Sequence, residues 1–399
     1  MTDYYVDLDN PGAWNGNTGL NHTGQEWLGL SGLQKAADTV TAGNTIFIKG
    51  TVICTDLKNI TYDNLSGTFT IGEEVQVDAS NKGIVSEDTG TILTVEVTAG
   101  SFSDNDQMTG QTSGATADVN VTIAVKVNGC DIDTNDGTVT GGVIKYIGVN
   151  DSWVNDGTRC KLDGNAGSIA GCHYVIKYSS NFIFFENIEI DDSDSYGFDN
   201  ASGYYSFVIN CWVHDCDGYG FEAAYYGVYV RCLATNNQYG FAGSSTAKFI
   251  ACVAHGNQYG FYSSNITVGC IAADNTVRGF GNQHNAFFNV ADTNADAFYN
   301  SGYYNTVVMF NRITNNTDDG VIVTAGETTY EDWNLFYNNT GDNYDDTSGT
   351  GLIEKGGNSK INSTGDGYTD QTNHDFNLTD SSDYRREAIS LPKWDGTSP

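Results

Sequence analysis

The chain has 399 residues, of which 39% are hydrophobic and 12% aromatic, enough to build an extended core. Its 18 Lys and Arg residues against 50 Asp and Glu residues give a formal net charge of −32, which disfavours binding to the phosphates of DNA or RNA. No run of 18 apolar residues occurs, so no membrane span is predicted.

Residues 1–60 predict an N-terminal cap followed by the first coil of a β structure. The segment Tyr4–Asp7 is strand-like, and a later helical pattern places four apolar residues on one face. These residues are Leu33, Ala36, Ala37 and Val40. Gly43 ends the pattern, and residues 45–48 predict a strand. We expect the short helix to cover the open edge of the first coil.

Residues 61–125 predict a small inserted β module made of two similar copies. Ser66-Gly67-Thr68-Phe69 is followed 33 residues later by Ala99-Gly100-Ser101-Phe102. Between the two, residues 91–97 alternate as a strand. Duplicated β modules of this kind resemble those of phage structural proteins.

Residues 126–399 predict a β-solenoid and its last coils. Four Tyr-Gly-Phe triplets begin at Tyr196, Tyr219, Tyr239 and Tyr259, at intervals of 23, 20 and 20 residues. The cysteines at 211, 232, 252 and 270 keep nearly the same interval. A period of about 20 residues is typical of coils of three short strands, whereas helical repeats need about 34 or more. The chain is therefore predicted to be all-β.

The cysteine series predicts which side chains enter the core. With strict alternation, the residues two positions before and two positions after each cysteine point inward. Those before are Ile209, Val230, Ile250 and Val268, and those after are Val213, Ala234, Ala254 and Ala272. Stacked thiols on parallel strands can pair only with loss of register, so we expect free buried cysteines and folding in a reducing compartment.

The same alternation predicts an apolar stripe on the outside of the solenoid. Its members, which we predict as interface residues, are Val208, Trp212, Tyr229, Leu233, Phe249, Val253 and Ile271. Contiguous exposed apolar patches usually mark an interface. The stripe therefore predicts a homo-oligomer, with a trimer favoured, or packing against another protein. The alternative is that a loop or tail of the chain itself covers the stripe.

Two further columns are candidates for a site. Tyr196, Tyr219, Tyr239 and Tyr259 are expected to stack along one edge, where aromatic rings could bind sugars or could merely stabilise a turn. Asp191, His214 and His255 lie three positions after the cysteine register and are candidate acid–base groups. Polar residues where a strand meets a turn are the simpler interpretation of that column.

Several segments resemble the pectin-lyase-like superfamily of right-handed parallel β-helix proteins. They are Tyr4–Asp7, residues 33–38, residues 44–50, the Tyr-Gly-Phe coils and Asp375–Leu378. The resemblance covers everything except the inserted module and implies a right-handed parallel β-helix. The superfamily includes polysaccharide lyases, glycoside hydrolases, epimerases, phage tailspikes and members without known activity. The aspartate cluster and neighbouring base of its lyases have no match here, so no catalytic residue is carried over.

No cofactor is predicted. The segment Asp131–Gly137 is similar to a calcium loop, but Asp136 stands where that loop needs glycine. Asp-rich turns more often form local hydrogen bonds than metal sites. Calcium thus has no complete motif in the sequence.

Two functions remain open at this point. The first is a bacteriophage virion protein that recognises a host-surface glycan through a β-helix shaft, folded in the host cytoplasm and bound to its own copies or to virion neighbours. Free cysteines, the apolar stripe, the duplicated module and a start without a secretion-signal pattern favour it. The second is an extracellular polysaccharide lyase or glycoside hydrolase, which rests on the resemblance. We expect the first, without enzymatic activity.

Overall fold

The chain is a right-handed parallel β-helix. The computed structural model describes residues 3–9, 27–53, 56–70, 72–121, 125–126, 130–133, 137–164, 174–200, 202–301, 305–324, 326–346, 351–357, 359–361, 368–370 and 375–378. These residues divide into two compact units, Met1–Ser195 and Tyr196–Pro399, each described by itself. No helix among them is both long enough and apolar enough to cross a bilayer.

The first unit holds one helix and the first parallel strands. Its elements outside the inserted module are β1 (Asp3–Asp7), β2 (Trp27–Leu28), α1 (Gly29–Thr39), β3 (Thr45–Lys49), β4 (Thr51–Ile53), β12 (Cys130–Ile132), β13 (Ile144–Gly148), β14 (Cys160–Asp163), β15 (Tyr174–Tyr178), β16 (Ile183–Glu186) and β17 (Ile188–Asp191). Parallel pairing joins β1 to β3, β3 to β13 and β13 to β16. A second series joins β4 to β14 and β14 to β17.

Helix α1 buries the face that the sequence predicted. Its apolar residues Leu33, Ala36 and Ala37 are at most 2% exposed, as is Val40 just beyond its end. The amide of Gln34 donates to the carbonyl oxygen of Asp131 and accepts from its backbone N–H, both at 2.7 Å. This side chain therefore satisfies backbone groups of β12 as a neighbouring strand would.

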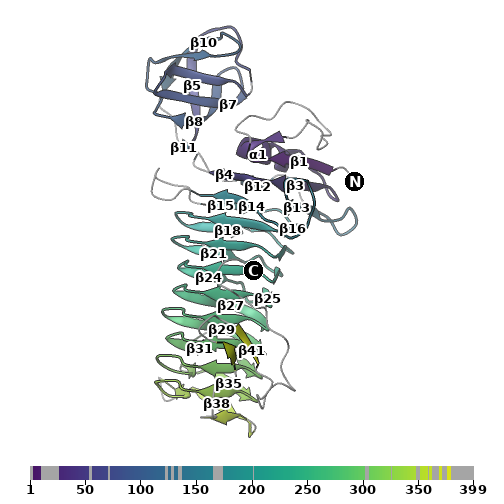
Figure 1. Cartoon of the computed structure of the whole chain (residues 1–399), viewed down its shortest axis with the longest axis vertical. Helices are drawn as coiled ribbons and strands as arrows, with labels where there is room; N and C mark the ends of the chain where they lie inside the picture. Colours follow the sequence, from purple (N-terminus) through teal and green to yellow (C-terminus); the bar gives the residue numbers. More distant parts are fainter. Residues whose placement is uncertain are drawn as a thin grey trace. The chain divides into compact units, whose positions relative to one another are not determined.

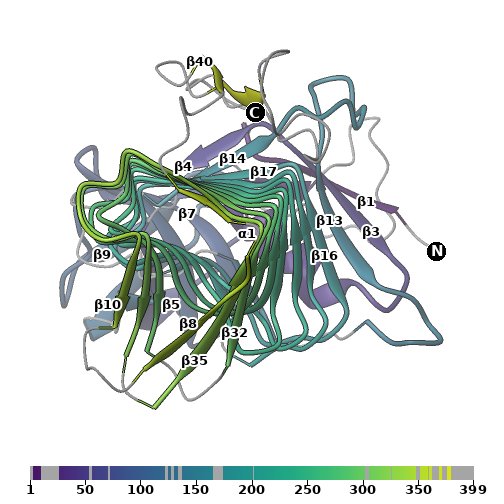
Figure 2. The same cartoon turned by 90° about the horizontal axis from the view of Figure 1, so that it is seen from below.

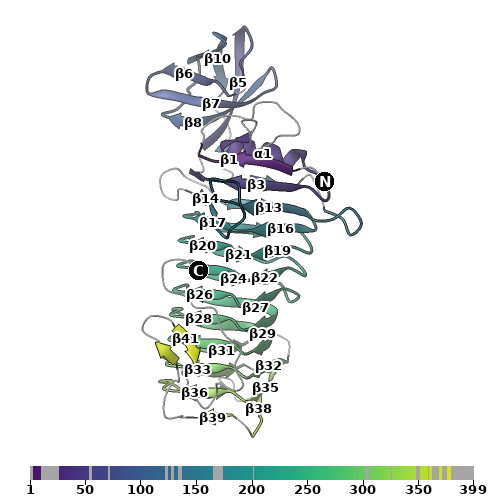
Figure 3. The ribbon, with the colours of Figure 1, turned by 45° about the vertical axis from the view of Figure 1, so that its right-hand side comes forward.

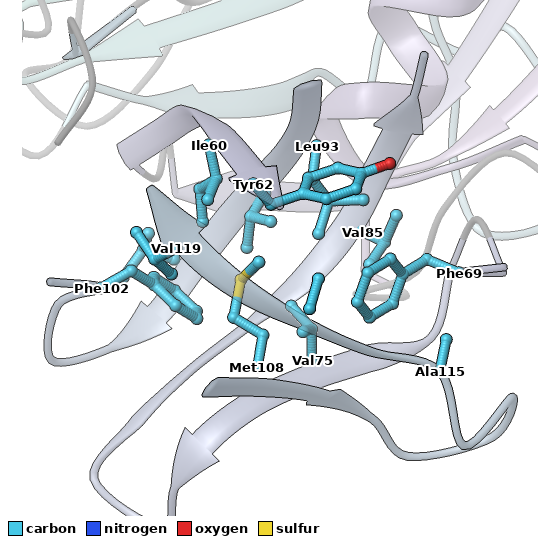
Figure 4. Close-up of a cluster of buried hydrophobic side chains, with 13 residues drawn as sticks. Ile60, Tyr62, Phe69, Val75, Val85, Leu93, Phe102, Met108, Ala115 and Val119 are labelled. Atoms are coloured by element: carbon cyan, nitrogen blue, oxygen red, sulfur yellow. The ribbon is translucent and has the colours of Figure 1, made fainter. Parts of the chain in front are cut away.

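The inserted module is an antiparallel barrel. Its strands are β5 (Asp56–Ser66), β6 (Glu74–Asp78), β7 (Asn81–Asp88), β8 (Ile92–Ala99), β9 (Gln107–Gly110), β10 (Thr116–Val121) and β11 (Val125–Lys126), in the sheet order β10-β9-β6-β7-β8-β5-β11. An additional pairing of β10 with β5 closes the sheet. Figure 4 shows its core, which includes Phe69, Phe102 and Met108.

The duplication inferred from the 33-residue offset is visible in matching turns. Glu73 accepts a hydrogen bond from the backbone N–H of Thr70 at 2.6 Å, and Asp106 accepts one from the N–H of Ser103 at 2.6 Å. The backbone carbonyl oxygen of each acidic residue also accepts a hydrogen bond in the same pattern, Glu73 from the N–H of Val85 and Asp106 from the N–H of Val119. Two copies of one β unit thus form the barrel.

The second unit is a stack of coils with three strands each (Figure 1). The first sheet contains β18 (Tyr196–Asn200), β21 (Tyr219–Glu222), β24 (Tyr239–Ala242), β27 (Tyr259–Val268), β29 (Arg278–Phe287), β31 (Asp296–Asn300), β34 (Val321–Val323) and β37 (Tyr344–Asp346). The second contains β19 (Phe207–Ile209), β22 (Val228–Val230), β25 (Lys248–Ile250), β32 (Thr306–Met309), β35 (Thr328–Asp332) and β38 (Leu352–Lys355), together with the ends of β27 and β29.

The third sheet completes each coil. It contains β20 (Trp212–His214), β23 (Leu233–Thr235), β26 (Val253–His255), β28 (Ile271–Ala273), β30 (Val290–Asp292), β33 (Arg312–Thr314), β36 (Leu335–Tyr337) and β39 (Lys360–Ile361). Seen along the stack, the coils of this unit superpose (Figure 2). A separate antiparallel hairpin, β40 (Tyr368–Asp370) with β41 (Asp375–Leu378), follows.

The predicted alternation is correct after each cysteine and wrong before it. Val213, Ala234, Ala254 and Ala272 are fully buried, as predicted. Ile250, predicted inside, is 38% exposed, and Ile209, Val230 and Val268 are half-buried. The cause is a residue with positive φ just before each cysteine, such as Asn210 at 50°. A left-handed residue turns the chain between two strands and so shifts the alternation by one position.

The predicted outward stripe is therefore wrong on its first column. Val208, Tyr229 and Phe249 are fully buried on the interior side of the second sheet. The second column does lie on the outer side of the third sheet, opposite the cysteines, but Leu233, Val253 and Ile271 are at most 6% exposed. They form one buried cluster with Val290, against which Trp212 packs.

The burial of this outer row favours the alternative that a segment of the chain covers it. The β40–β41 hairpin lies on this side of the third sheet (Figures 2 and 3). The row is consequently not an exposed apolar interface, and it no longer supports assembly into a trimer.

Candidate functional site

Asparagine ladders hold the coils in register next to the Tyr-Gly-Phe triplets. The backbone N–H of each ladder residue donates to the side-chain oxygen of the residue one coil further on, at 2.9–3.1 Å. The members are Asn237, Asn257, Asn275, Asn294, Asn316 and Asn339. A second ladder of Asn289, Asn311 and Asn334 continues the cysteine column. Sequence reasoning missed both, although Asn237 and Asn257 each stand two residues before a tyrosine.

The glycine of each triplet is required by close packing on this ladder. A Cβ added to Gly240 would lie 2.8 Å from the carbonyl oxygen of Gly260 and 2.9 Å from Nδ2 of Asn257. Both contacts are shorter than ordinary van der Waals separations, so no side chain fits. The phenylalanines that follow are buried and stacked, with Phe221, Phe241 and Phe261 at centroid distances of 4.8 Å.

The predicted tyrosine stack is present on the outer side of the first sheet. Tyr196, Tyr219, Tyr239 and Tyr259 are half-buried, in register, and separated by 5.1, 4.7 and 4.7 Å with interplanar angles of 8–12°. Because neighbouring rings cover each other's flat faces, a sugar can approach only their edges and hydroxyl groups. The stack thus offers a row of hydrogen-bonding phenols rather than open aromatic platforms.

Two carboxyl groups lie beside this row. Asp199 and Glu222 occupy adjacent strands β18 and β21 and share a side-chain hydrogen bond, which requires one of them to carry a proton. Burial first, and then the hydrogen bond and charge of Asp199, raise the pKa of Glu222 to about 7. Burial, with the charges of Glu222 and Asp199, also raises the pKa of Tyr196, so these groups are close enough to interact.

Arg278 continues the tyrosine column on β29. Its guanidinium lies 3.2 Å from the ring centroid of Tyr299 and 5.9 Å from that of Tyr259. Its Nε is 3.7 Å from a carboxylate oxygen of Asp296. The positive charge is therefore held between two rings and paired with an acid.

We call the outer side of the first sheet the tyrosine face. Its residues are Tyr196, Asp199, Tyr219, Glu222, Tyr239, Tyr259, Tyr262, Arg278, Asp296 and Tyr299. It presents phenol hydroxyls on four successive coils, carboxyl groups on β18, β21 and β31, and one guanidinium on β29. Such a surface can donate and accept hydrogen bonds along an extended polar ligand.

An acidic cluster borders the face. Carboxylate oxygens of Asp296, Asp318 and Asp319 lie within 4.8 Å of one another, so these residues could hold a cation. Burial and the charge of Asp318 raise the pKa of Asp296 to about 6, although Arg278 opposes the shift. Of the calcium-like segment 131–137, residues 134–136 lie outside the described part of the chain.

The candidate acid–base column is distributed over both units. In the second unit, His214, Thr235 and His255 are in register on successive coils, as predicted. His214 contacts a carboxylate oxygen of Asp215 at 2.7 Å, and His255 contacts one of Asp274 at 2.9 Å. These histidines thus have acidic partners.

Asp191 belongs to the first unit. It forms an ion pair with Lys161 at 2.8 Å. The amine of Lys161 also donates a hydrogen bond to Asp191, so Asp191 has a structural partner of its own.

The comparisons with known proteins identify the fold. No family model matches the chain, and no curated protein sequence matches it. The solved structure of pectate lyase Pel9A is similar, with a TM-score of 0.52 and 13% identity over 96% of this chain and 90% of that one. This likeness shows a shared parallel β-helix fold and nothing about activity.

More distant structures were also found. A rhamnogalacturonan lyase matches with a TM-score of 0.43 and 11% identity, over 100% of this chain and 97% of that one. ORF18 of Geobacillus virus E2 matches with a TM-score of 0.37 and 13% identity, over 86% of this chain and 60% of that one. Neither similarity is close enough to carry a functional argument.

Proposed function

We propose that the second unit binds a glycan along the tyrosine face, and that the chain recognises a host-surface polysaccharide as part of a bacteriophage virion. The observation that carries the binding proposal is the Asp199–Glu222 pair next to a row of phenol groups on one sheet. Sugars present many hydroxyl groups, which donate to carboxylates and accept from phenols. A face with both kinds of partner matches that chemistry.

Binding by this face predicts a specific loss in two variants. Tyr219→Phe removes one hydroxyl and Glu222→Gln removes one carboxyl, so each should weaken binding of a responsive polysaccharide by roughly five- to tenfold, the worth of one hydrogen bond. Affinity electrophoresis against a panel of bacterial surface polysaccharides measures this. Tyr226→Phe, on an exposed turn elsewhere in the unit, is the matched control. Equal losses in all three variants would contradict the assignment to this face.

Polysaccharide cleavage is the second candidate, and the carboxyl pair is what favours it. A carboxyl with a pKa of about 7 keeps its proton near neutral pH, as a general acid must. However, retaining glycosidases hold their two carboxyls about 5–5.5 Å apart and inverting ones about 6.5–9.5 Å apart. Asp199 and Glu222 hold in-register positions on adjacent strands, about 4.8 Å apart, which leaves no room between them for the water of an inverting enzyme, so we favour binding over hydrolysis.

A reducing-sugar assay on the polysaccharide that binds separates the two candidates. We expect no new reducing ends or unsaturated products at any pH between 5 and 8. Release that disappears in Glu222→Gln would move the proposal to an enzyme.

The virion location and the oligomeric state are proposals from the sequence. The described cysteines are free and buried, which fits folding in a reducing cytoplasm. We retain as proposals a homo-oligomer, with a trimer favoured, or contact with neighbouring virion proteins, although the buried outer row supports neither. Mass photometry of the purified chain should show trimers at nanomolar to micromolar concentrations, and monomers alone would overturn the homo-oligomer.

A further inference from the structure

The charges on the tyrosine face constrain the ligand. Two columns of described residues run along it: Tyr196, Tyr219, Tyr239, Tyr259, Arg278 and Asp296 in one, and Asp199, Glu222, Ala242, Tyr262, Gly281 and Tyr299 in the other. Within these two columns three residues are acidic and Arg278 is the single base. The balance on the face is therefore negative.

The single base is already engaged. The guanidinium of Arg278 is 3.2 Å from the ring centroid of Tyr299, and its Nε is 3.7 Å from Asp296. The nearby carboxylate offsets the charge of the guanidinium, so Arg278 and Asp296 together add no net positive charge to the face. Arg278 thus does not make the face positive for an acidic sugar.

We propose that the tyrosine face takes an uncharged glycan and discriminates against polyuronates and other acidic glycans. This inference rests on the proposed function, because it names the substrate class of the same site. A uronate bound along the columns would bring its carboxylates against Asp296 and against the Asp199–Glu222 pair, which keeps one negative charge while it shares a proton. Like charges this close lie within the Debye length of about 8 Å at physiological salt and are not screened from each other. Neutral sugars avoid this repulsion and keep every hydrogen bond.

The proposed preference for uncharged glycans differs from what the name of a structural neighbour would suggest. Pectate, after which the lyase Pel9A is named, is a polyuronate. The shared fold imposes no shared ligand, since the ligand is recognised by side chains on the outer sheet rather than by the coil backbone.

A matched pair of probes tests the inference. Polygalacturonate and its methyl ester have the same backbone but differ in charge, and an array of uncharged, carboxylated and amino polysaccharides extends the comparison. We expect the full chain to bind at least one uncharged probe and to bind every carboxylated probe at least tenfold more weakly. Carboxylated probes bound as tightly as the best uncharged one would overturn the inference alone. Binding to no probe would overturn the proposed function and this inference with it.

A charge-neutral variant assigns the effect to the face. Asp199→Asn combined with Glu222→Gln removes both carboxyls while keeping their shape, and should reduce the discrimination against polygalacturonate several-fold. Asp104→Asn combined with Asp151→Asn removes the same number of carboxyl groups at two exposed positions in the first unit. Equal effects in the two double variants would show that overall charge, rather than the face, excludes acidic glycans, and would overturn the assignment. Circular dichroism verifies that each variant is folded.

Discussion

Single residues at strand junctions determine what the interior of the second unit contains. Asn210, Arg231 and Ala251 all have φ near 50°, and each precedes a buried cysteine. Left-handed backbone is most accessible to asparagine and glycine, and it costs other residues about 1 kcal/mol or more. The four coils with a cysteine here all make this turn nonetheless. The turn is what allows both the cysteine and the residue three positions before it to point inward.

The asparagine ladder places polar side chains in the core, where each needs its hydrogen-bond partners. Asn257 accepts a hydrogen bond from the backbone N–H of Asn237 and donates to the carbonyl of Ala234, all within the core. We predict that Asn257→Ala lowers the free energy of unfolding by about 3 kcal/mol, because each buried group left unsatisfied costs about 1–3 kcal/mol. Urea denaturation measures it. The adjacent exposed Gln258→Ala should change stability by less than about 0.5 kcal/mol, and a similar loss there would contradict the explanation.

The carboxyl pair predicts a pH dependence. The pKa of Glu222 is raised from 4.5 to about 7 in the folded chain, so its favourable contribution is complete below pH 4.5 and is lost as pH rises through 7. Glu222→Gln should therefore gain in Tm relative to the wild type between pH 5 and pH 8, as measured by differential scanning fluorimetry. Glu354→Gln, at an exposed site, should keep a constant Tm difference from the wild type over the same pH range. If Tm changes with pH in the same way for the wild type and both variants, Asp199 and Glu222 do not share a proton.

At the scale of elements, the triplet glycines set how closely one coil approaches the next. Gly240→Ala would place a methyl group 2.8 Å from a backbone oxygen of the following coil, and we predict a loss of about 2 kcal/mol in unfolding free energy. Gly357→Ala is the control, because a Cβ there meets nothing within 4 Å and its φ is not left-handed. Thermal denaturation compares the two variants. If they are equally stable, close packing is not the reason for the glycine at position 240.

The elements that repeat were predictable from the sequence, and those that depend on register were not. Spacing predicted the coils, because one period recurs in several residue types, and also the helix face and a duplicated β module. It did not indicate that this module closes into a barrel. The junction residues reversed the alternation before the cysteines, and no composition rule identifies Ala251 or Arg231 as left-handed. The Asp199–Glu222 pair was missed for a similar reason, since residues 23 positions apart meet only once β18 and β21 are aligned.

At the scale of the molecule, stability accumulates coil by coil. Each coil in the second unit contacts mainly the one before and the one after it, so a local loss weakens its neighbours first. The stacked interior of Phe198, Phe221, Phe241, Phe261, Phe280 and Phe298, with centroid distances of 4.7–5.4 Å, is continuous along this unit. Asn257→Ala and Gly240→Ala should therefore reduce the cooperativity of unfolding as well as stability.

The buried cysteines allow the opening of individual coils to be followed by chemical labelling. Cys211, Cys232, Cys252 and Cys270 place one fully buried thiol in each of four consecutive coils, and burial raises the pKa of Cys232 and Cys252 well above the ordinary value. An alkylating reagent can therefore mark a thiol only while its coil is open to solvent. Mass spectrometry of the order in which these four thiols are alkylated would show at which end the coils open first. No engineered label is needed.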